Sequence, residues 1–322
     1  MRALLVSALS EDLSGCGLAD IAEPVRGAGE LLVRVRAASL NYPDLLMTRG
    51  AYQLKPPLPF VPGMEMAGEV VAADEDSGFV AGDRVVCGTR TGSFADYVTC
   101  SAAATRRVPA GMDHATAASI GTAYLTAYVA LVRLARVQPG EWVLVHGATG
   151  GVGLATVDLA GAIGAKVIAT SRSAEKLAIV ARDHAPAAVL PATDFHEKVK
   201  AITGGGADVI VDPVGGDVFD QSVRAIAFGG RLLVVGFTSG RIATVATNLP
   251  LIKGFSVIGV RAGEYGRRFP ASGAEDLDTI WAMAAAGTLR PRVHKTYQLA
   301  DWREAFAAMA KSDLIGKLVI EP

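Results

Sequence analysis

The pattern of hydrophobic and polar positions changes near residue 110. Before this point, short runs that alternate apolar and polar residues are interrupted by Gly, Pro and Asp, as in ELLVRVRAA, MAGEVVAA, GDRVVCG and FADYVTC. This region is predicted to be rich in β-strands. The opening run MRALLV is predicted to be a strand rather than a signal peptide, because Glu11 and Asp12 follow closely and no small-residue cleavage site is evident.

From Ala115 onward, helical and strand-like segments alternate. The segment ATAASIGTAYLTAYVALVRLA has helical spacing, and strands are predicted at EWVLVHG, KVIATS, AAVL, DVIVDPV, RLLVVGF and FSVIGV, with helices between most of them. Repeated units of this length predict an α/β fold with a parallel, doubly wound sheet. After Arg261, two further helices are predicted at DLDTIWAMAAAG and DWREAFAAMAKS, followed by a closing strand at GKLVIEP.

The stretch HGATGGVG, residues 146–153, lies between the first strand and the first helix of this alternating series. Glycines at such a turn let the backbone approach a pyrophosphate, and the helix N-terminus supplies N–H groups and the positive end of a dipole. We interpret the stretch as a dinucleotide-binding turn, the alternative being a tight connection that binds nothing. The expected contacts are Gly150, Gly151, Val152 and Gly153.

The end of the next strand distinguishes NAD from NADP. An NAD site usually has an acidic residue there, about 20 residues beyond the glycines, to hold the ribose 2′-hydroxyl. Here the strand ends at Ser171 without a carboxylate, and Arg172 and Lys176 follow. Two cations suit a 2′-phosphate, so NADPH is the predicted cofactor. The alternative is that both cations lie on a solvated helix face.

Composition narrows the class of protein. A chain of 322 residues is long enough for two domains, and 51% hydrophobic residues, 20% charged residues and a net charge of -1 are typical of a compact soluble protein. Neither a basic patch for nucleic acid nor an apolar run of membrane-spanning length is present. The three cysteines form no C-x-x-C pair, which favours a reducing, cytoplasmic location.

Taken together, several motifs resemble those of the medium-chain dehydrogenase/reductases, in particular their zinc-free quinone oxidoreductase and enoyl reductase branch. These motifs are NYPDLLMTRGAY, PFVPGMEMAGEV, GDRVV, GSFADYV, the glycine turn and GKLVIEP, so the resemblance covers essentially the whole chain. It implies a GroES-like β-rich catalytic domain at residues 1–115, completed by 261–322, and a Rossmann NADP(H)-binding domain at 116–260. It also implies a homodimer, because relatives commonly pair their Rossmann sheets edge to edge.

The resemblance also indicates that no metal is bound. Zinc enzymes of the family carry Cys where this chain has Asn41, and Gly-His-Glu where it reads Gly63, Met64 and Glu65. A Met cannot replace imidazole at such a site, the four-Cys structural lobe is absent, and the five histidines lack ligand spacing.

Without zinc, the acceptor must delocalise the charge that hydride brings. We therefore expect an NADPH-dependent oxidoreductase that transfers hydride to a quinone or to the β-carbon of an α,β-unsaturated carbonyl. An enoyl thioester is the alternative acceptor. An NADPH-binding structural or regulatory protein with little turnover is the alternative of another class.

The resemblance assigns the remaining site residues. Tyr52 matches a tyrosine taken as proton donor or enolate stabiliser, although it could instead pack half-buried beneath the prolines of LKPPLP. Asn41 is expected to face the nicotinamide and the reacting substrate, although Asn-x-x-Asp at a strand-to-helix junction is by default a capping device, and Asp44 is expected mainly to hold its loop. The other expected cofactor contacts are Thr126 and Phe237 near the nicotinamide and Lys317 near the adenosine phosphate.

Overall fold

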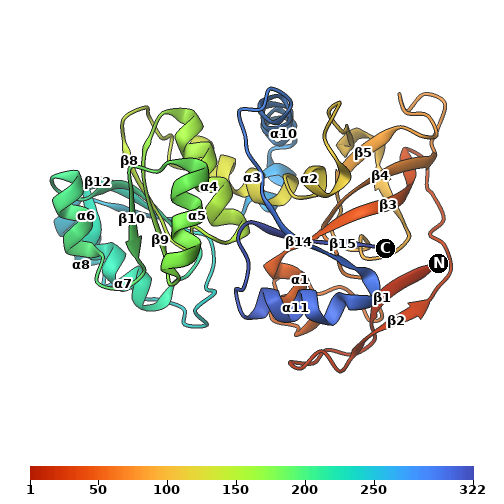
Figure 1. Cartoon of the computed structure of the whole chain (residues 1–322), viewed down its shortest axis with the longest axis horizontal. Helices are drawn as coiled ribbons and strands as arrows, with labels where there is room; N and C mark the ends of the chain where they lie inside the picture. The colour runs from red at the N-terminus through yellow and green to blue at the C-terminus, as the bar shows by residue number, and fades with distance from the viewer. The chain divides into compact units, whose positions relative to one another are not determined.

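The chain forms two compact units in the computed structural model, which describes all 322 residues. Residues 1–122 and 291–322 form the first unit, and residues 123–290 form the second. In Figure 1 the colour follows the chain, so the first unit combines the red and orange N-terminal segments with the dark blue C-terminal one.

The first unit is built around a seven-stranded sheet in the order β14-β15-β3-β4-β5-β7, with β6 paired to β3. The bounds are β3 Glu30–Leu40, β4 Glu65–Ala72, β5 Arg84–Gly88, β6 Tyr97–Ser101, β7 Arg106–Arg107, β14 Val293–Gln298 and β15 Lys317–Glu321. A separate antiparallel pair consists of β1 Arg2–Val6 and β2 Cys16–Asp20. The helices are α1 Tyr42–Thr48, α2 His114–Ala118 and α11 Trp302–Ala310. The predicted β-rich region, including the opening strand, is confirmed.

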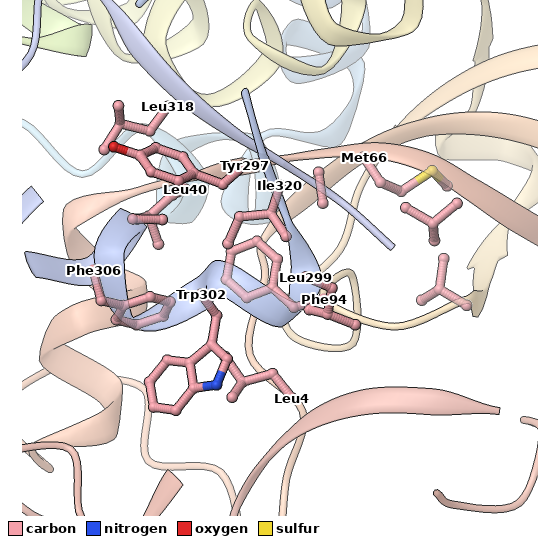
Figure 2. Close-up of a cluster of buried hydrophobic side chains, with 14 of the residues drawn as sticks. Leu4, Leu40, Met66, Phe94, Tyr297, Leu299, Trp302, Phe306, Leu318 and Ile320 are labelled. Carbon is pink, nitrogen blue, oxygen red and sulfur yellow. The ribbon is translucent and has the colours of Figure 1, made fainter. Parts of the chain in front are cut away.

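The core of this unit joins the two ends of the chain. Figure 2 shows Leu4 and Phe94 among side chains of the C-terminal segment, including Trp302, Phe306 and Ile320. The Phe306 ring lies edge-on to both the Phe94 and Trp302 rings, with centroids 6.1 and 5.7 Å away. Burial of these large apolar side chains stabilises the packing of the C-terminal residues in the first unit.

The second unit contains a six-stranded parallel sheet in the order β10-β9-β8-β11-β12-β13. The bounds are β8 Trp142–Val145, β9 Lys166–Ser171, β10 Ala188–Pro191, β11 Ala207–Asp212, β12 Ile226–Val234 and β13 Ser256–Gly259. Within this sheet, β9 and β10 are added in sequence on one side of β8, and β11, β12 and β13 are added on its other side. The direction in which strands are added therefore reverses between β8 and β11. This confirms the predicted doubly wound sheet, which binds ligands beyond the carboxyl ends of its strands at such a switch point.

Helices connect these strands. Their bounds are α4 Gly151–Ile163, α5 Ala174–His184, α6 His196–Thr203, α7 Gly216–Ala225, α8 Asn248–Lys253, α9 Ala262–Arg268 and α10 Pro270–Ala285. The long helix predicted after residue 115 is divided into α2, α3 (Gly121–Tyr128) and the π-helix η2 (Val129–Leu134). None of the helices is long and apolar enough to cross a lipid bilayer.

The two units differ from the predicted domains at their internal boundaries. The first unit continues to Thr122, and residues 261–290 belong to the second unit. In the second unit, Arg133 of η2 donates from Nε to Asp276 Oδ1 of α10 over 2.7 Å, and Asp276 is buried. A buried carboxylate needs such a partner, so this ion pair holds α10 to the second unit.

Candidate functional site

The glycine turn of the second unit brings backbone against backbone. Gly147 has φ +56°, and a Cβ added to Gly153 would lie 2.1 Å from the Gly147 carbonyl oxygen, so glycine is required at position 153. Gly150 is the N-cap of α4, and no side chain caps the helix. The first N–H groups of α4 therefore face no capping side chain, which is the arrangement that suits a phosphate.

The end of β9 lies beside this turn. Ser171 is the last residue of β9, and its Oγ is 3.3 Å from Thr149 Oγ1 of the turn. The N–H of Ala148 also donates to the Thr170 carbonyl over 3.0 Å. The structure thus brings the predicted pyrophosphate turn and the predicted 2′-phosphate end together.

The two predicted cations lie at the start of α5. Ser173 is the N-cap, and its Oγ accepts from the Lys176 N–H over 3.2 Å, which places Lys176 in the first turn. Arg172 directly precedes the N-cap, is exposed, and has no ion-pair partner. A positive charge at Arg172, beside the N-terminus of α5, suits a dianion.

Two more loops lie at the same edge of the sheet. Asp212 at the end of β11 accepts from the N–H groups of Val214 and Gly215 over 2.8 and 2.9 Å, and burial raises the pKa of its carboxyl. The Phe237 ring lies against Gly215, where a Cβ would be 2.9 Å from Phe237 Cδ1. The N–H groups of Thr238 and Ser239 donate to the carbonyls of Pro213 and Val214 over 3.1 and 3.0 Å, which holds the loop that carries Phe237 beside the loop after β11.

His146 links the elements that carry the turn. Its Nδ1 is 2.8 Å from Thr170 Oγ1 of β9, and its Nε2 is 2.8 Å from Ser222 Oγ of α7. The ring is fully buried, and this burial lowers its pKa to about 3. His146 is therefore a neutral structural bridge at neutral pH.

Replacement of His146 by glutamine is expected to flatten the pH dependence of the free energy of unfolding. Below about pH 6.5 the imidazole of the unfolded protein binds a proton, whereas the buried ring of the folded protein does not. This histidine therefore makes the free energy of unfolding fall as pH falls. The slope approaches ~1.4 kcal/mol per pH unit, or ~2 kcal/mol between about pH 6.5 and pH 5. Chemical denaturation at a series of pH values measures the difference, and parallel curves for the two proteins would contradict this role.

In the first unit, Asn41 caps α1 together with Asp44. The Asn41 N–H donates to Asp44 Oδ2 over 2.8 Å, and the Gly63 N–H donates to Asp44 Oδ1 over 3.0 Å. Burial raises the pKa of the Asp44 carboxyl to about 7. Asp44 therefore holds the loop, as expected, and ties the start of α1 to the segment that contains Met64 and Glu65.

The side chain of Asn41 belongs to a buried polar network. Its Oδ1 accepts from Lys317 Nζ over 2.6 Å, and its Nδ2 donates to Glu65 Oε1 over 2.9 Å and to the Ser39 carbonyl over 3.2 Å. Lys317 also bonds Glu65 Oε1 over 3.0 Å. Lys317 was expected near the adenosine phosphate, but its ammonium is engaged inside the first unit, and these contacts favour a role there instead.

Tyr52 lies between α1 and β4, is half-buried, and packs against the apolar core of the first unit. Its hydroxyl has no hydrogen-bond partner in the protein. Thr126 lies in α3 and is half-buried in the second unit. The ring of Tyr52 is thus packed on this core, and its hydroxyl stays available.

Comparisons with known proteins identify the family. Residues 27–110 match the alcohol dehydrogenase GroES-like domain, and residues 151–279 match the domain described as zinc-binding dehydrogenase. A quinone oxidoreductase-like protein 2 homologue of Nematostella vectensis is 38% identical over 91% of this chain and 82% of its own length. The chain is a medium-chain dehydrogenase/reductase. The superfamily assignment makes it an oxidoreductase with a GroES-like and a Rossmann domain.

Solved structures of other medium-chain dehydrogenase/reductases have the same fold. The quinone oxidoreductase of Thermus thermophilus, solved also as a complex with NADPH, is 30% identical and superimposes with a TM-score of 0.88 over 100% of both chains. The CurK enoyl reductase is 25% identical, with a TM-score of 0.89 over 99% of this chain and 98% of its own.

One family description mentions zinc, but the residues of this medium-chain dehydrogenase/reductase do not fit a zinc site. Asn41 and Met64 stand where zinc relatives have ligands, and Lys317, Asn41 and the Thr122 N–H occupy the oxygens of Glu65. No group of three or more His, Cys, Asp or Glu side chains lies close enough together to hold a metal ion. Two neutral side chains and an internally paired carboxylate do not offer zinc the charge that it requires.

Sequence reasoning missed several of these contacts. His146 is one of the five histidines that lack ligand spacing, and the sequence indicates no role for Thr149 or Asp212. The signal for Asp212 was a carboxylate at a strand end just before Gly215 and Gly216. For His146, the signal was its position at the end of an apolar strand directly before the glycine turn.

Proposed function

We propose that the protein is an NADPH-dependent, zinc-independent reductase that transfers hydride to a quinone or to the β-carbon of an α,β-unsaturated carbonyl. The observation that carries this proposal is the β9 end beside the glycine turn, where Ser171 and Arg172 stand in place of a carboxylate. An acid at this position would repel a 2′-phosphate, whereas Arg172 attracts it.

The second unit supplies the residues that would hold the cofactor. Gly150, Gly151, Val152 and Gly153 would bind the pyrophosphate with the start of α4, and Ser171, Arg172 and Lys176 would bind the 2′-phosphate. Thr126 and Phe237 are proposed for the nicotinamide end. When bound, NADPH supplies the hydride. The NADPH complex of the Thermus thermophilus relative supports this assignment.

The first unit is proposed to manage the negative charge that develops on the acceptor. Conjugation spreads this charge as an enolate or a hydroquinone anion, so one hydrogen-bond donor near the oxygen or the α-carbon suffices. Tyr52 fits this role because its hydroxyl is not used by the protein. Asn41 does not fit as a donor, because its Nδ2 hydrogens are directed to Glu65 and Ser39.

Two acceptor classes are supported by the relatives. The quinone oxidoreductase-like homologue and the Thermus thermophilus enzyme support a quinone. The similarity to CurK enoyl reductase, together with the available Tyr52 hydroxyl, supports an enoyl thioester. The two acceptors differ in their need for a proton donor, because water can protonate a hydroquinone anion directly.

Steady-state oxidation of NADPH with a panel of quinones, enones and enoyl thioesters tests the proposal. We expect turnover with at least one acceptor, and faster turnover with NADPH than with NADH. Tight NADPH binding without turnover of any acceptor would instead support a structural or regulatory protein.

We also propose that the protein is a homodimer that pairs through the β13 edge of the second unit. β13 is an edge strand, and the adjacent elements β12 and α8 carry exposed apolar side chains: Phe228 is 85% exposed, Leu251 81% and Ile252 70%. An open edge with such side chains favours association with a second copy.

Replacement of Phe228 and Leu251 together by glutamate is expected to raise the dimer dissociation constant at least ~10²-fold, since each truncated or charged anchor of an interface costs ~2 kcal/mol or more. Analytical ultracentrifugation measures the constant. Val25 of the first unit is 92% exposed, so Val25→Glu is the matched control and should leave the dimer intact. A monomeric wild-type protein at micromolar concentration would contradict the proposal.

A further inference from the structure

Three strand ends of the first unit bring distant residues together. Lys317 begins β15, Glu65 begins β4, and Asn41 follows the end of β3. The central strand β3 pairs with both others, with Leu40 opposite Leu318 and Ala38 opposite Met66. Because residues across a ladder are neighbours, these pairings place Lys317 and Glu65 beside Asn41 although they are 276 and 24 residues away in sequence.

The contacts determine which way the Asn41 amide points. Its oxygen faces the Lys317 ammonium, and its nitrogen faces the Glu65 carboxylate. The reversed orientation would place an NH₂ group against an ammonium and an oxygen against a carboxylate. Both contacts would become repulsive, and buried polar groups would lose their partners.

The charges of this network are balanced and fixed. The side chains of Lys317 and Glu65 are 7% and 1% exposed. The other Glu65 oxygen, Oε2, accepts from the Thr122 N–H over 2.7 Å at the start of α3, and a Cβ at Gly121 would lie 2.9 Å from that oxygen. Glu65 therefore cannot follow Lys317 to another position without losing a buried hydrogen bond.

A buried ion pair of this kind contributes little net stability, because burial of the two charges costs about as much as their attraction returns. An apolar or neutral pair of similar volume could fill the same space. The geometry therefore points to a role other than stability for the two charges.

We propose that Lys317 is a positioning residue that acts through Asn41. Its ammonium, balanced by Glu65, fixes the amide of Asn41 with the oxygen toward Lys317 and the nitrogen toward Glu65. The first unit therefore keeps one arrangement of partial charges at Asn41 while the acceptor is reduced. This inference rests on the proposed function for its effect on turnover, but the orientation of the amide can be measured without turnover.

Four variants test the role of the pair. Lys317→Met and Glu65→Gln each leave one buried partner uncompensated and are expected to destabilise the fold. The double variant Lys317→Met/Glu65→Gln removes both charges at similar volume and is expected to unfold near the wild-type temperature. Lys295→Met is the matched control, because Lys295 is an exposed lysine on the neighbouring strand β14.

Two measurements are made on the double variant. The side-chain ¹⁵N–¹H resonances of Asn41, assigned by their loss in Asn41→Ala, should shift in the double variant and stay unchanged in Lys295→Met. The kcat for acceptor reduction should fall at least ~10-fold, while the KM for NADPH stays within about two-fold, which separates positioning from cofactor binding.

The outcomes distinguish this inference from the proposed function. A double variant that folds, keeps the Asn41 resonances and retains the wild-type kcat would overturn the positioning role. If the wild-type protein reduces no acceptor, the proposed function fails, and the Asn41 resonances of Lys317→Met, in which Glu65 is kept, then decide whether Lys317 orients the amide. A shift of equal size in Lys295→Met would also overturn the inference.

Discussion

Replacement of Arg172 and Lys176 together by alanine is expected to remove most of the preference for NADPH over NADH. Arg172 directly follows the β9 end at Ser171, and Lys176 lies in the first turn of α5. Each charge-assisted contact with the 2′-phosphate contributes ~1.5 to 3 kcal/mol. The ratio of the two dissociation constants should therefore fall by ~10²- to 10⁴-fold, almost entirely through weaker NADPH binding.

Titration of nucleotide fluorescence with both cofactors measures this ratio at one fixed ionic strength, because salt screens exposed charges. Lys166→Ala is the matched control. Lys166 is an exposed lysine at the opposite end of β9, over the Trp142 ring, so its loss should leave the ratio unchanged. Equal affinities of the unmodified protein for NADPH and NADH would contradict the cofactor assignment.

The arrangement of the residues proposed to bind the cofactor was predictable because its signals are local. The β8 strand, the glycine turn and the start of α4 are consecutive, and each has a periodicity or a backbone requirement of its own. The order of the parallel strands then places successive strand ends at one edge of the sheet. The residue that follows β9 could therefore be assigned to the vicinity of the glycine turn before its contacts were known.

The role of Lys317 could not be predicted in this way. The run GKLVIEP indicates a strand but does not reveal its neighbours, and the two partners of Lys317 are 276 and 252 residues away. Only the pairing of β15 with β3, and of β3 with β4, brings a cation to Asn41. The family resemblance suggested a phosphate contact for this lysine, but its engagement with Asn41 and Glu65 argues against one.

The place of α9 and α10 in the second unit could not be predicted for a similar reason. An amphipathic helix pattern shows that one face is buried but does not show which core buries it. The decisive contact is the ion pair between Arg133 and the buried Asp276. Neither residue stands out in the sequence, because Arg and Asp are common on solvated helix faces.

The hydrogen bonds of Asn41 change the balance between the two candidate catalytic residues. Both Asn41 and Tyr52 were expected at the reacting substrate. In the structure the Asn41 amide donates to Glu65 and Ser39, whereas the Tyr52 hydroxyl donates to no group of the protein. A proton donor must be free to reach the substrate, so we propose the chemical role for Tyr52 rather than for Asn41.

Replacement of Tyr52 by phenylalanine is expected to lower kcat for an enone or enoyl thioester by ~10²-fold or more while NADPH affinity stays nearly constant. Phenylalanine keeps the ring that packs on the core of the first unit, and no protein hydrogen bond is lost with the hydroxyl. Stability should therefore be unchanged, so a loss of turnover would report the chemistry of the hydroxyl. The effect on a quinone should be smaller, because water can protonate the hydroquinone anion.

Tyr297→Phe provides the comparison for this experiment. Tyr297 is buried in the same apolar core, and its ring lies under the Lys295 ammonium, 4.3 Å from the centroid. Its replacement removes a tyrosine hydroxyl from the same unit and should leave kcat unchanged for every acceptor. Full activity of Tyr52→Phe with enones, enoyl thioesters and quinones alike would assign Tyr52 to packing alone. The developing negative charge would then have to be met by backbone N–H groups, since the amide hydrogens of Asn41 and the Lys317 ammonium are already bonded.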